Sequence, residues 1–157
     1  MSAPLEALDP FVRQDGQRTA HENTGCNQNE IRHMLTTETA IVTGASQGIG
    51  ASLVTRFLEK GFTVVGNSRA ISDSTHLTPS SQLALVEGDI ADSATAQKIT
   101  DTAIARFGRI DILVNNAGLL VSKPFIDYTP DDFEALVSTI LAGFFYISQS
   151  AASPEIS

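Results

Sequence analysis

The chain has 157 residues, of which 42% are hydrophobic and 18% are charged, and its formal net charge is −8 at pH 7. This size predicts a single globular domain, and the acidic balance argues against a nucleic-acid-binding surface, because phosphate backbones require a basic face. Cys26 is the only cysteine, so an intrachain disulfide is excluded, and no Cys/His cluster has metal-ligand spacing. We therefore expect neither a metal site nor a nucleic-acid partner.

The sequence predicts a cytoplasmic location and no membrane partner. No run approaches the roughly 20 apolar residues that a membrane helix needs. The N-terminus lacks the apolar stretch of a signal peptide, and its early acidic residues, Glu6, Asp9 and Asp15, are atypical of a transit peptide.

The first 37 residues differ in character from the rest. They are polar, carry scattered Pro and Gly, and show no sustained periodicity, which is typical of a disordered or loosely attached extension. A regulatory or docking arm is the alternative, although no motif supports it. We expect the folded domain to cover residues 38–152 and residues 153–157 to form a tail.

The folded part opens with an apolar run, residues 40–42, that leads directly into a glycine-rich turn over residues 43–50. A strand turning sharply into a helix presents unpaired backbone N–H groups and the positive end of the helix dipole, which together favour a phosphate. Gly44 can adopt backbone angles forbidden to other residues, Gly48 lets the chain approach a pyrophosphate, and Gly50 lets the helix lie close to the sheet. A plain tight connection is the alternative.

Short apolar runs then alternate with helical periodicity, which predicts a parallel sheet with helices on both faces. The later strands are expected over residues 62–66, 83–87 and 111–115. The helices are expected to begin at the glycine turn, at an Asp92 cap and at Thr129, and the first two to end at Gly61 and Gly108. Ligands bind such sheets beyond the carboxyl ends of the strands, where the sequence places Gly44, Arg69, Asp89 and Asn115.

Each expected helix has one apolar face. In the first helix this face contains Ile49, Leu53, Phe57 and Leu58, and in the second it contains Ala96, Ile99, Ala103 and Phe107. The third helix carries a broad apolar stripe, formed by Phe133, Leu136, Val137, Ile140, Leu141, Phe144 and Phe145.

Three motifs, in this order and spacing, resemble those of the short-chain dehydrogenase/reductases over about residues 38–150. They are Thr43-Gly44-Ala45-Ser46-Gln47-Gly48-Ile49-Gly50, Gly88-Asp89-Ile90 and Asn115-Asn116-Ala117-Gly118. The resemblance implies a Rossmann-like, doubly wound parallel α/β sheet, here of about four strands in the order 3-2-1-4. It also implies a nicotinamide dinucleotide cofactor.

The resemblance implies roles for single residues as well. Ser46 and Ile49 would contact the cofactor phosphates, the second motif would meet the adenine through Asp89 and Ile90, and the third would meet the nicotinamide-side ribose. A solvated turn acid at Asp89 and a structural strand cap in the third motif are the alternatives. The residues expected to contact the cofactor are Gly44, Ser46, Gln47, Gly48, Ile49, Gly50, Ser68, Arg69, Asp89, Ile90, Asn115, Ala117 and Gly118.

The end of the second strand favours NADP(H) over NAD(H). NAD-binding sheets place an acid there, about 20 residues past the glycine turn, whereas an arginine accommodates the 2′-phosphate. This sequence has Asn67-Ser68-Arg69 and no acid, so Ser68 can donate to the phosphate and Arg69 can pair with it. The alternative is that Arg69 is an ordinary surface arginine.

The catalytic residues of the family have no counterpart in this sequence. The family relies on a serine and on a Tyr and Lys spaced Y-x-x-x-K, but neither Tyr128 nor Tyr146 has lysine at the fourth place. A further asparagine of the family, on the long helix, aligns with Ile140, or with Thr139 after a one-residue slip. We therefore assign no catalytic residue.

After Ala152 the sequence stops resembling the family, so we expect half a fold with residues 112–114 as an exposed edge strand. Such a chain would be marginally stable, or would dimerise through the apolar stripe with itself or with a full-length relative. Three functions stay open: an NADP(H)-dependent carbonyl reductase or alcohol dehydrogenase by descent, inactive alone; a non-catalytic nucleotide-binding or dimerisation module; and a truncated gene product without function.

Overall fold

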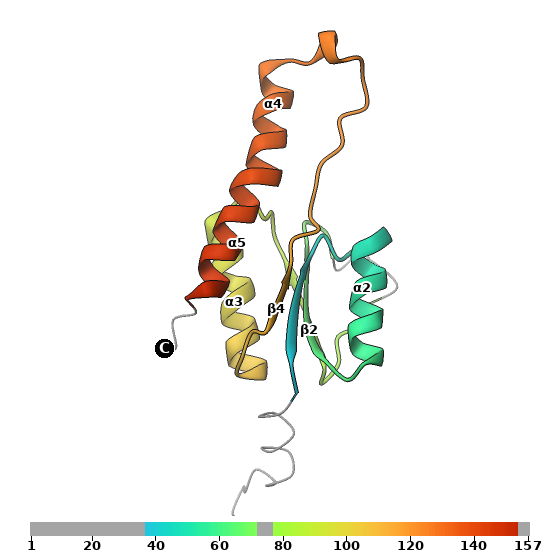
Figure 1. The fold of residues 1–157 in the computed structure, drawn as a ribbon, viewed down its shortest axis with the longest axis vertical. Helices are drawn as coiled ribbons and strands as arrows, with labels where there is room; N and C mark the ends of the chain where they lie inside the picture. The colour runs from blue at the N-terminus through green and yellow to red at the C-terminus, as the bar shows by residue number, and fades with distance from the viewer. Residues whose placement is uncertain (1–36, 72–76, 154–157) are drawn as a thin grey trace, which may run out of the picture.

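The computed structural model describes residues 37–71 and 77–153. The expected N-terminal extension, apart from Thr37, and the expected tail, apart from Ser153, lie outside these residues. The described part is built on a four-stranded sheet (Figure 1). Its strands are β1 (Thr39–Thr43), β2 (Thr63–Ser68), β3 (Leu83–Glu87) and β4 (Ile112–Val114).

The sheet has the predicted topology. All three strand pairs are parallel, and the order is β3-β2-β1-β4. The first strand, β1, lies inside the sheet between β2 and β4, so β3 and β4 are the edges. The prediction of a parallel sheet in the order 3-2-1-4 is therefore confirmed.

Two strand ends differ from the prediction. β2 continues past Gly66 to Ser68, because Asn67 and Ser68 pair with Val86 and Glu87 of β3. β4 is shorter than the expected residues 111–115, and its ladder to β1 spans only Ile112–Val114.

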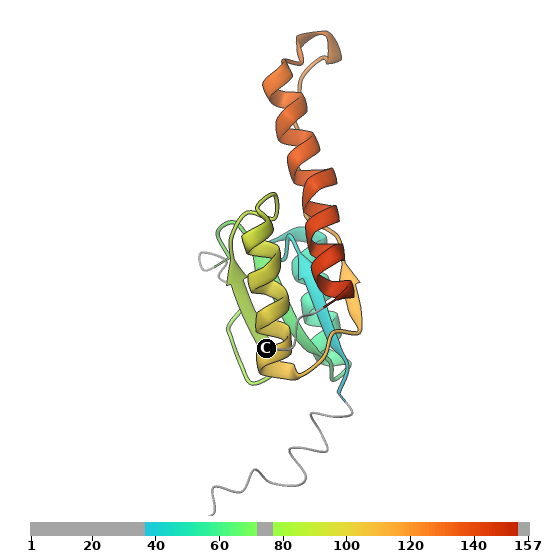
Figure 2. The same ribbon diagram turned by 90° about the vertical axis from the view of Figure 1, so that its left-hand side faces the viewer.

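Helices cover both faces of the sheet (Figures 1 and 2). One face carries α2 (Gly48–Glu59), and the other carries α3 (Ser93–Phe107) and α5 (Gly143–Ala152), which pack against each other. A short 3₁₀ turn, η1 (Phe125–Asp127), precedes α4 (Pro130–Leu136), and the π-helical segment η2 (Val137–Ala142) joins α4 to α5. Together α4, η2 and α5 form one long helical rod, residues 130–152, that extends well beyond the sheet (Figure 1).

The core lies on the two sides of β1, all of whose residues are buried. Adjacent residues of a strand point to opposite faces, and Ile41 and Val42 accordingly belong to different apolar clusters. Ile41 packs in the cluster under α3 and α5, together with Ile99 and Ile147. Val42 packs in the cluster under α2, together with Val54.

The helix α3 confirms its predicted ends and face. Asp92 Oδ1 accepts a hydrogen bond from the Ala94 amide at 2.9 Å, which caps the N-terminus. Gly108 ends the helix with φ of 79°, and its amide donates to the Ile104 carbonyl. The predicted apolar face is buried along its length, at Ala96, Ile99, Ala103 and Phe107.

The prediction for the apolar face of α2 is wrong at one residue. Leu53, Phe57 and Leu58 pack against the core beside the buried Val54, but Ile49 is 73% exposed. Ile49 lies in the first turn of the helix, at the carboxyl end of the sheet, where no strand remains to cover it. Its side chain instead borders the cleft described below.

The long rod begins at the predicted Thr129 cap, where the structure forms a capping box. Thr129 Oγ1 accepts from the Asp132 amide at 3.3 Å, and Asp132 Oδ2 accepts from the Thr129 amide at 2.8 Å. Further along, most of the stripe is uncovered: Phe133 and Leu141 are 67% and 63% exposed, and Ile140, Phe144 and Phe145 are also exposed. The structure thus contains the exposed stripe and the edge strand that the sequence predicts.

The sequence-based expectation that no segment is apolar enough to span a membrane is wrong by length and composition. Within the described residues, Pro130–Ala152 forms one helical run of 23 residues whose most apolar window has a mean hydropathy of 1.4. Only 11% of that window is buried. Core helices of soluble proteins meet the same criteria, so this property does not assign a membrane role.

Candidate functional site

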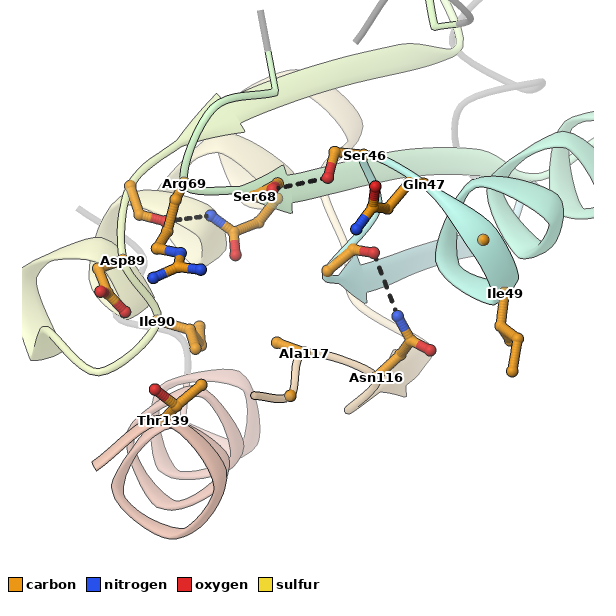
Figure 3. A pocket seen from close by; sticks show the side chains of 15 residues that line it. Ser46, Gln47, Ile49, Ser68, Arg69, Asp89, Ile90, Asn116, Ala117 and Thr139 are labelled. Carbon is orange, nitrogen blue, oxygen red and sulfur yellow. Dashed lines mark hydrogen bonds between the residues drawn. The ribbon is translucent and has the colours of Figure 1, made fainter. Parts of the chain in front are cut away.

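A cleft of about 370 Å³ lies at the carboxyl ends of the four strands (Figure 3). The glycine turn forms one wall, and the ends of β2, β3 and β4 form the others, with Thr139 of η2 opposite. All of the predicted cofactor-binding residues border it except Gly50 and Asn115. Those that do are Gly44, Ser46, Gln47, Gly48, Ile49, Ser68, Arg69, Asp89, Ile90, Ala117 and Gly118.

The glycines of the turn have distinct structural roles. Gly44 has φ of +65°, and a Cβ there would lie 2.9 Å from the Ala117 Cα. A Cβ on Gly50 would lie 2.2 Å from the Gly44 carbonyl oxygen, so Gly50 allows α2 to pack against the turn. Gly48 has φ of +56°, and a Cβ added to it would have no atom within 4 Å. It therefore leaves open space where the turn faces the cleft.

The start of α2 is suited to an anion. Its N-cap residue, Gln47, makes no side-chain capping hydrogen bond, and the first turn carries no acidic residue. The first backbone N–H groups of a helix have no partner within the helix, and the helix dipole is positive at this end. The pyrophosphate of a dinucleotide fits such a turn.

Polar groups at the ends of β1 and β2 lie beside this turn. The Ser68 hydroxyl donates to Ser46 Oγ at 2.9 Å, which joins the end of β2 to the glycine turn. Asn67 is buried and donates from Nδ2 to the carbonyls of Val86 and Gly88, at 3.0 and 3.1 Å. Asn67 thereby holds the ends of β2 and β3 together.

Arg69 is the cation of the cleft. Its side chain is exposed and reaches into the cleft (Figure 3). Within residues 37–71 and 77–153 it forms no hydrogen bond or ion pair. The guanidinium is therefore free to pair with an anionic ligand.

Asp89 and Ile90 form the wall at the end of β3. Asp89 is exposed, and its Oδ1 accepts from the Ala91 amide at 3.0 Å, so it combines a turn-stabilising role with access to the cleft. Ile90 is 4% exposed and packs in the core as well as bordering the cleft. A Cβ on Gly143 would lie 2.9 Å from Ile90 Cγ2, so the long rod passes directly behind this residue.

The two asparagines after β4 point in different directions. Asn116 borders the cleft, and its Nδ2 donates to the carbonyls of Thr43 and Gly44 at 3.0 and 3.2 Å. Asn115, which was expected to meet the ribose, donates from Nδ2 to Ser148 Oγ at 3.3 Å. It borders a second cleft of about 290 Å³, whose other walls include Ile140 and Phe144.

The structure adds four cleft residues that the sequence-based assignment omits, namely Asn67, Gly88, Asn116 and Thr139. Asn116 adjoins Asn115 in the same motif, but both follow the end of β4 at Val114, so strand alternation does not decide which of the two faces the cleft. Asn67 directly precedes Ser68 and Arg69 at the end of the second strand, and Gly88 is the first residue of the Gly88-Asp89-Ile90 motif. The only sequence feature that pointed to Thr139 was its possible alignment, after a one-residue slip, with the asparagine of the family.

Neither tyrosine lines the main cleft. The Tyr128 hydroxyl donates to the Val121 carbonyl at 2.5 Å, in the connection before α4. Tyr146 packs against the core cluster under α3 and next to the Phe145 ring. The described residues also contain no group of His, Cys, Asp or Glu that could hold a metal ion.

The shifted carboxylates lie away from the cleft. Hydrogen bonds from Lys123 and Thr129 lower the pKa of Asp132 to about 2. Burial opposes ionisation of Asp111, but the hydrogen bonds from the Arg109 guanidinium and the Thr39 amide hold the pKa of Asp111 below its usual value. Both carboxylates therefore support the structure at element ends, and neither is part of the candidate site.

A parallel sheet whose first strand turns through glycines into a helix, with a cleft at the strand ends, defines a dinucleotide-binding α/β protein. The family model for short chain dehydrogenases matches residues 38–155. The chain belongs to this oxidoreductase family, which uses a nicotinamide dinucleotide cofactor.

Individual relatives agree with this assignment. A 3alpha-hydroxysteroid dehydrogenase of Mediterraneibacter gnavus is 34% identical over 126 residues, which cover 76% of this chain and 50% of the relative. The crystal structure of a short-chain dehydrogenase/reductase from Brucella melitensis is 31% identical, with a TM-score of 0.67 over 73% of this chain and 50% of the other. The aldohexose dehydrogenase of Thermoplasma acidophilum is 28% identical, with a TM-score of 0.64 and coverage of 74% and 43%. The chain thus spans about half the length of these relatives.

Proposed function

We propose that this chain binds NADP(H) in the cleft at the strand ends. In this proposal the pyrophosphate lies on the first turn of α2, near Ser46 and Ile49, and the adenine lies between Asp89 and Ile90. The nicotinamide half extends toward Ala117 and Gly118, and toward Asn115 across the second cleft.

The preference for NADP(H) depends on one observation, the cluster of Ser46, Ser68 and Arg69. A 2′-phosphate beside these residues would meet two hydroxyls and a guanidinium that has no ion pair among the described residues, and the sequence at the end of β2, Asn67-Ser68-Arg69, contains no acid. Charge-assisted hydrogen bonds of this kind are roughly twice as strong as neutral ones. An NAD-preferring site would instead need an acid here to hold the ribose hydroxyl.

We further propose that the chain binds the cofactor without turning over a substrate. Bound nicotinamide supplies or accepts a hydride, and the carbonyl oxygen of the substrate must gain or lose a proton in the same reaction. Neither tyrosine lines the main cleft, and no Y-x-x-x-K pair occurs in the sequence. Without a positioned proton donor, the family reaction loses general acid–base catalysis.

Titration of the 157-residue chain with NADPH and with NADH, followed by nucleotide fluorescence, tests the binding proposal. We expect NADPH to bind at least about 10-fold more tightly, the low end for a hydrogen-bonded charge pair. Parallel assays with a panel of ketone and secondary-alcohol substrates test the absence of turnover. Equal affinities would refute the NADP(H) preference, and turnover would refute the non-catalytic role.

The exposed stripe on the rod favours a second function, pairing with another protein chain of the family. Five large apolar side chains are exposed there, and contiguous apolar surface of this kind marks interaction sites. A second copy of this chain or a full-length relative would cover it. Both functions suit a cytoplasmic protein, which we propose as its location.

A further inference from the structure

Charged side chains line only one side of the two clefts. Of the described residues that line them, only Arg69 and Asp89 ionise, and these follow β2 and β3. None of the residues that line the second cleft carries a charge. In the close view Arg69 and Asp89 lie on the same side, away from Asn116 (Figure 3). The side of the clefts that adjoins β4 and the rod is therefore uncharged.

The polar side chains on this uncharged side already have partners within the protein. Asn115 Nδ2 donates to a serine of α5, and Asn116 Nδ2 donates to two backbone carbonyls at the start of the glycine turn. Thr43 Oγ1 accepts from the Asn116 and Ala117 amides at 3.1 and 3.0 Å. These contacts hold the end of β4 against β1 and the rod, so the groups that make them serve the fold.

The opposite side of the main cleft offers groups without such partners. The Arg69 guanidinium makes no hydrogen bond or ion pair within residues 37–71 and 77–153. The first backbone N–H groups of α2 have no partner within the helix, and both kinds of group suit phosphates. A dinucleotide would therefore gain its polar contacts through its 2′-phosphoadenosine diphosphate end, whereas its nicotinamide end would meet uncharged walls.

Oxidised and reduced cofactors differ in charge at the nicotinamide. The oxidised ring carries one positive charge, which is lost when the ring accepts a hydride. A binding site can detect this difference through a charged group near the ring, because charge interactions weaken with distance and are screened by salt over about 10 Å. On the uncharged side of the clefts, Thr139 offers a neutral hydroxyl, and Phe144 offers a ring that is 53% exposed. An exposed ring attracts a cation only weakly.

We infer that this chain does not distinguish NADP⁺ from NADPH. It holds either form by the 2′-phosphoadenosine diphosphate end, so its occupancy follows the total concentration of the two forms and not their ratio. The ligand class is then any nucleotide that carries this end, whatever the state of its nicotinamide. This inference depends on the proposed function, because it concerns the ligand of the same cleft.

Calorimetric titration of the 157-residue chain with three nucleotides tests the inference. The nucleotides are NADP⁺, NADPH and 2′-phospho-ADP-ribose, which lacks the nicotinamide. We expect NADP⁺ and NADPH to bind within about 5-fold of each other, the upper limit for a charge interaction at an exposed site. The nicotinamide-free compound should bind within about 10-fold of NADPH, as expected when at most one hydrogen bond is lost.

Two matched variants test the physical reason. Phe144 and Phe145 are neighbours on the rod and are each 53% exposed, but only Phe144 lines the second cleft, and Phe145 lines neither cleft. Phe144→Glu adds a carboxylate to the uncharged wall and should shift the preference toward NADP⁺ by about 2- to 5-fold. Phe145→Glu adds the same charge away from the clefts and should leave the ratio of the two affinities unchanged. Both variants remove a Phe from the stripe, so any change in self-association affects them alike.

Three results would overturn the inference and leave the proposed function standing. The first is a preference of the unchanged chain for NADP⁺ or NADPH beyond about 5-fold. The second is a loss of more than about 10-fold for the nicotinamide-free compound. The third is a ratio that Phe144→Glu does not shift, or that both variants shift equally, because the nicotinamide would then not lie against the uncharged wall. If the unchanged chain binds none of the three nucleotides, the inference and the proposed function are both wrong.

Discussion

In the proposed function, the guanidinium of Arg69 is the group that makes the cleft prefer NADP(H) over NAD(H). It is exposed, reaches into the cleft, and makes no ion pair within the part of the chain that the structure describes. No carboxylate of the described residues therefore neutralises its charge by direct contact. A ligand with a 2′-phosphate would gain from this charge, and a ligand with a 2′-hydroxyl would gain little.

Replacing Arg69 with Gln should therefore weaken NADPH by about 10-fold or more and leave NADH nearly unchanged. The measurement is a fluorescence titration of both nucleotides. Arg56→Gln is the control, because Arg56 pairs with Glu59 on the exposed side of α2. An equal loss for NADPH and NADH in Arg69→Gln would show that Arg69 does not read the 2′-phosphate.

Gly50 permits the close contact between α2 and the glycine turn. An added Cβ would lie 2.2 Å from the Gly44 carbonyl oxygen and 2.7 Å from Asn116 Nδ2. Because the first of these atoms is backbone, the turn and the helix must separate. Gly50→Ala should therefore lower the free energy of unfolding by about 1–3 kcal/mol, as overpacking does.

The measurement is the urea midpoint of Gly50→Ala, with Gly118→Ala as its control. Gly118 also belongs to a quoted motif, but no atom lies within 4 Å of an added Cβ, and its φ is not positive. Gly118→Ala should stay within about 0.5 kcal/mol of the unchanged chain. A Gly50→Ala variant of unchanged stability would mean that the glycine turn is looser than the structure indicates.

At the scale of single elements, the start of α4 illustrates how local chemistry sets a helix end. Asp132 accepts hydrogen bonds from the amide and the hydroxyl of Thr129 and forms an ion pair with Lys123. These contacts lower the pKa of Asp132 from 3.8 to about 2 in the folded state. A carboxylate whose pKa is lowered by folding stabilises the fold at pH values above its unfolded-state pKa. This contribution to stability is lost as the pH falls toward the folded-state pKa.

We therefore expect the stability contributed by Asp132 to be present above about pH 4 and to disappear as the pH falls toward 2. Asp132→Asn should remove this part of the pH dependence, which urea midpoints between these pH values would measure. Asp131→Asn is the control, since the Asp131 side chain makes no hydrogen bond or ion pair among the described residues. If the two variants have the same pH profile, the capping contacts of Asp132 contribute nothing to stability.

The sequence was informative wherever a local pattern determines the structure by itself. Helix α3 begins after Asp92 and ends at Gly108, as predicted. A capping acid and a glycine in the left-handed conformation both act within one turn of their helix. The end of β2 could not be predicted from its own sequence, because Asn67 and Ser68 extend the strand by pairing with β3. Ile49 was misjudged because helical periodicity does not say where the sheet ends.

The cleft was harder to predict than the fold, because it is made by segments far apart in the sequence. The motif residues at the glycine turn and after β3 do lie along it, whereas Asn115 and Asn116 required knowledge of which face each side chain takes. Thr139 could not be placed without the π-helical segment, which changes the direction of the side chains that follow. The hydrophobic periodicity of residues 130–152 does not predict that π-helical segment.

At the scale of the whole molecule, the rod is a long element with little to cover it. Its last turns pack on α3 through the buried Ile147, but the stripe along the rest is exposed. Each Phe left in water forgoes roughly 1.5–3 kcal/mol, against a typical domain stability of about 5–15 kcal/mol. The edge strand β4 adds unpaired backbone groups, because β1 is its only strand neighbour among the described residues.

We therefore predict that the 157-residue chain self-associates through the stripe, and that Phe144→Asp shifts it toward the monomer. The substitution should weaken association because it would bury an unpaired charge in the interface. Light scattering after size exclusion would measure the molar mass at several concentrations. Phe125→Asp is the control, since Phe125 is 87% exposed but lies in η1, off the stripe. Because exposed apolar surface is the reason for association, a chain that remains a cooperatively melting monomer at all concentrations would refute both the interface and the marginal stability from which we infer it.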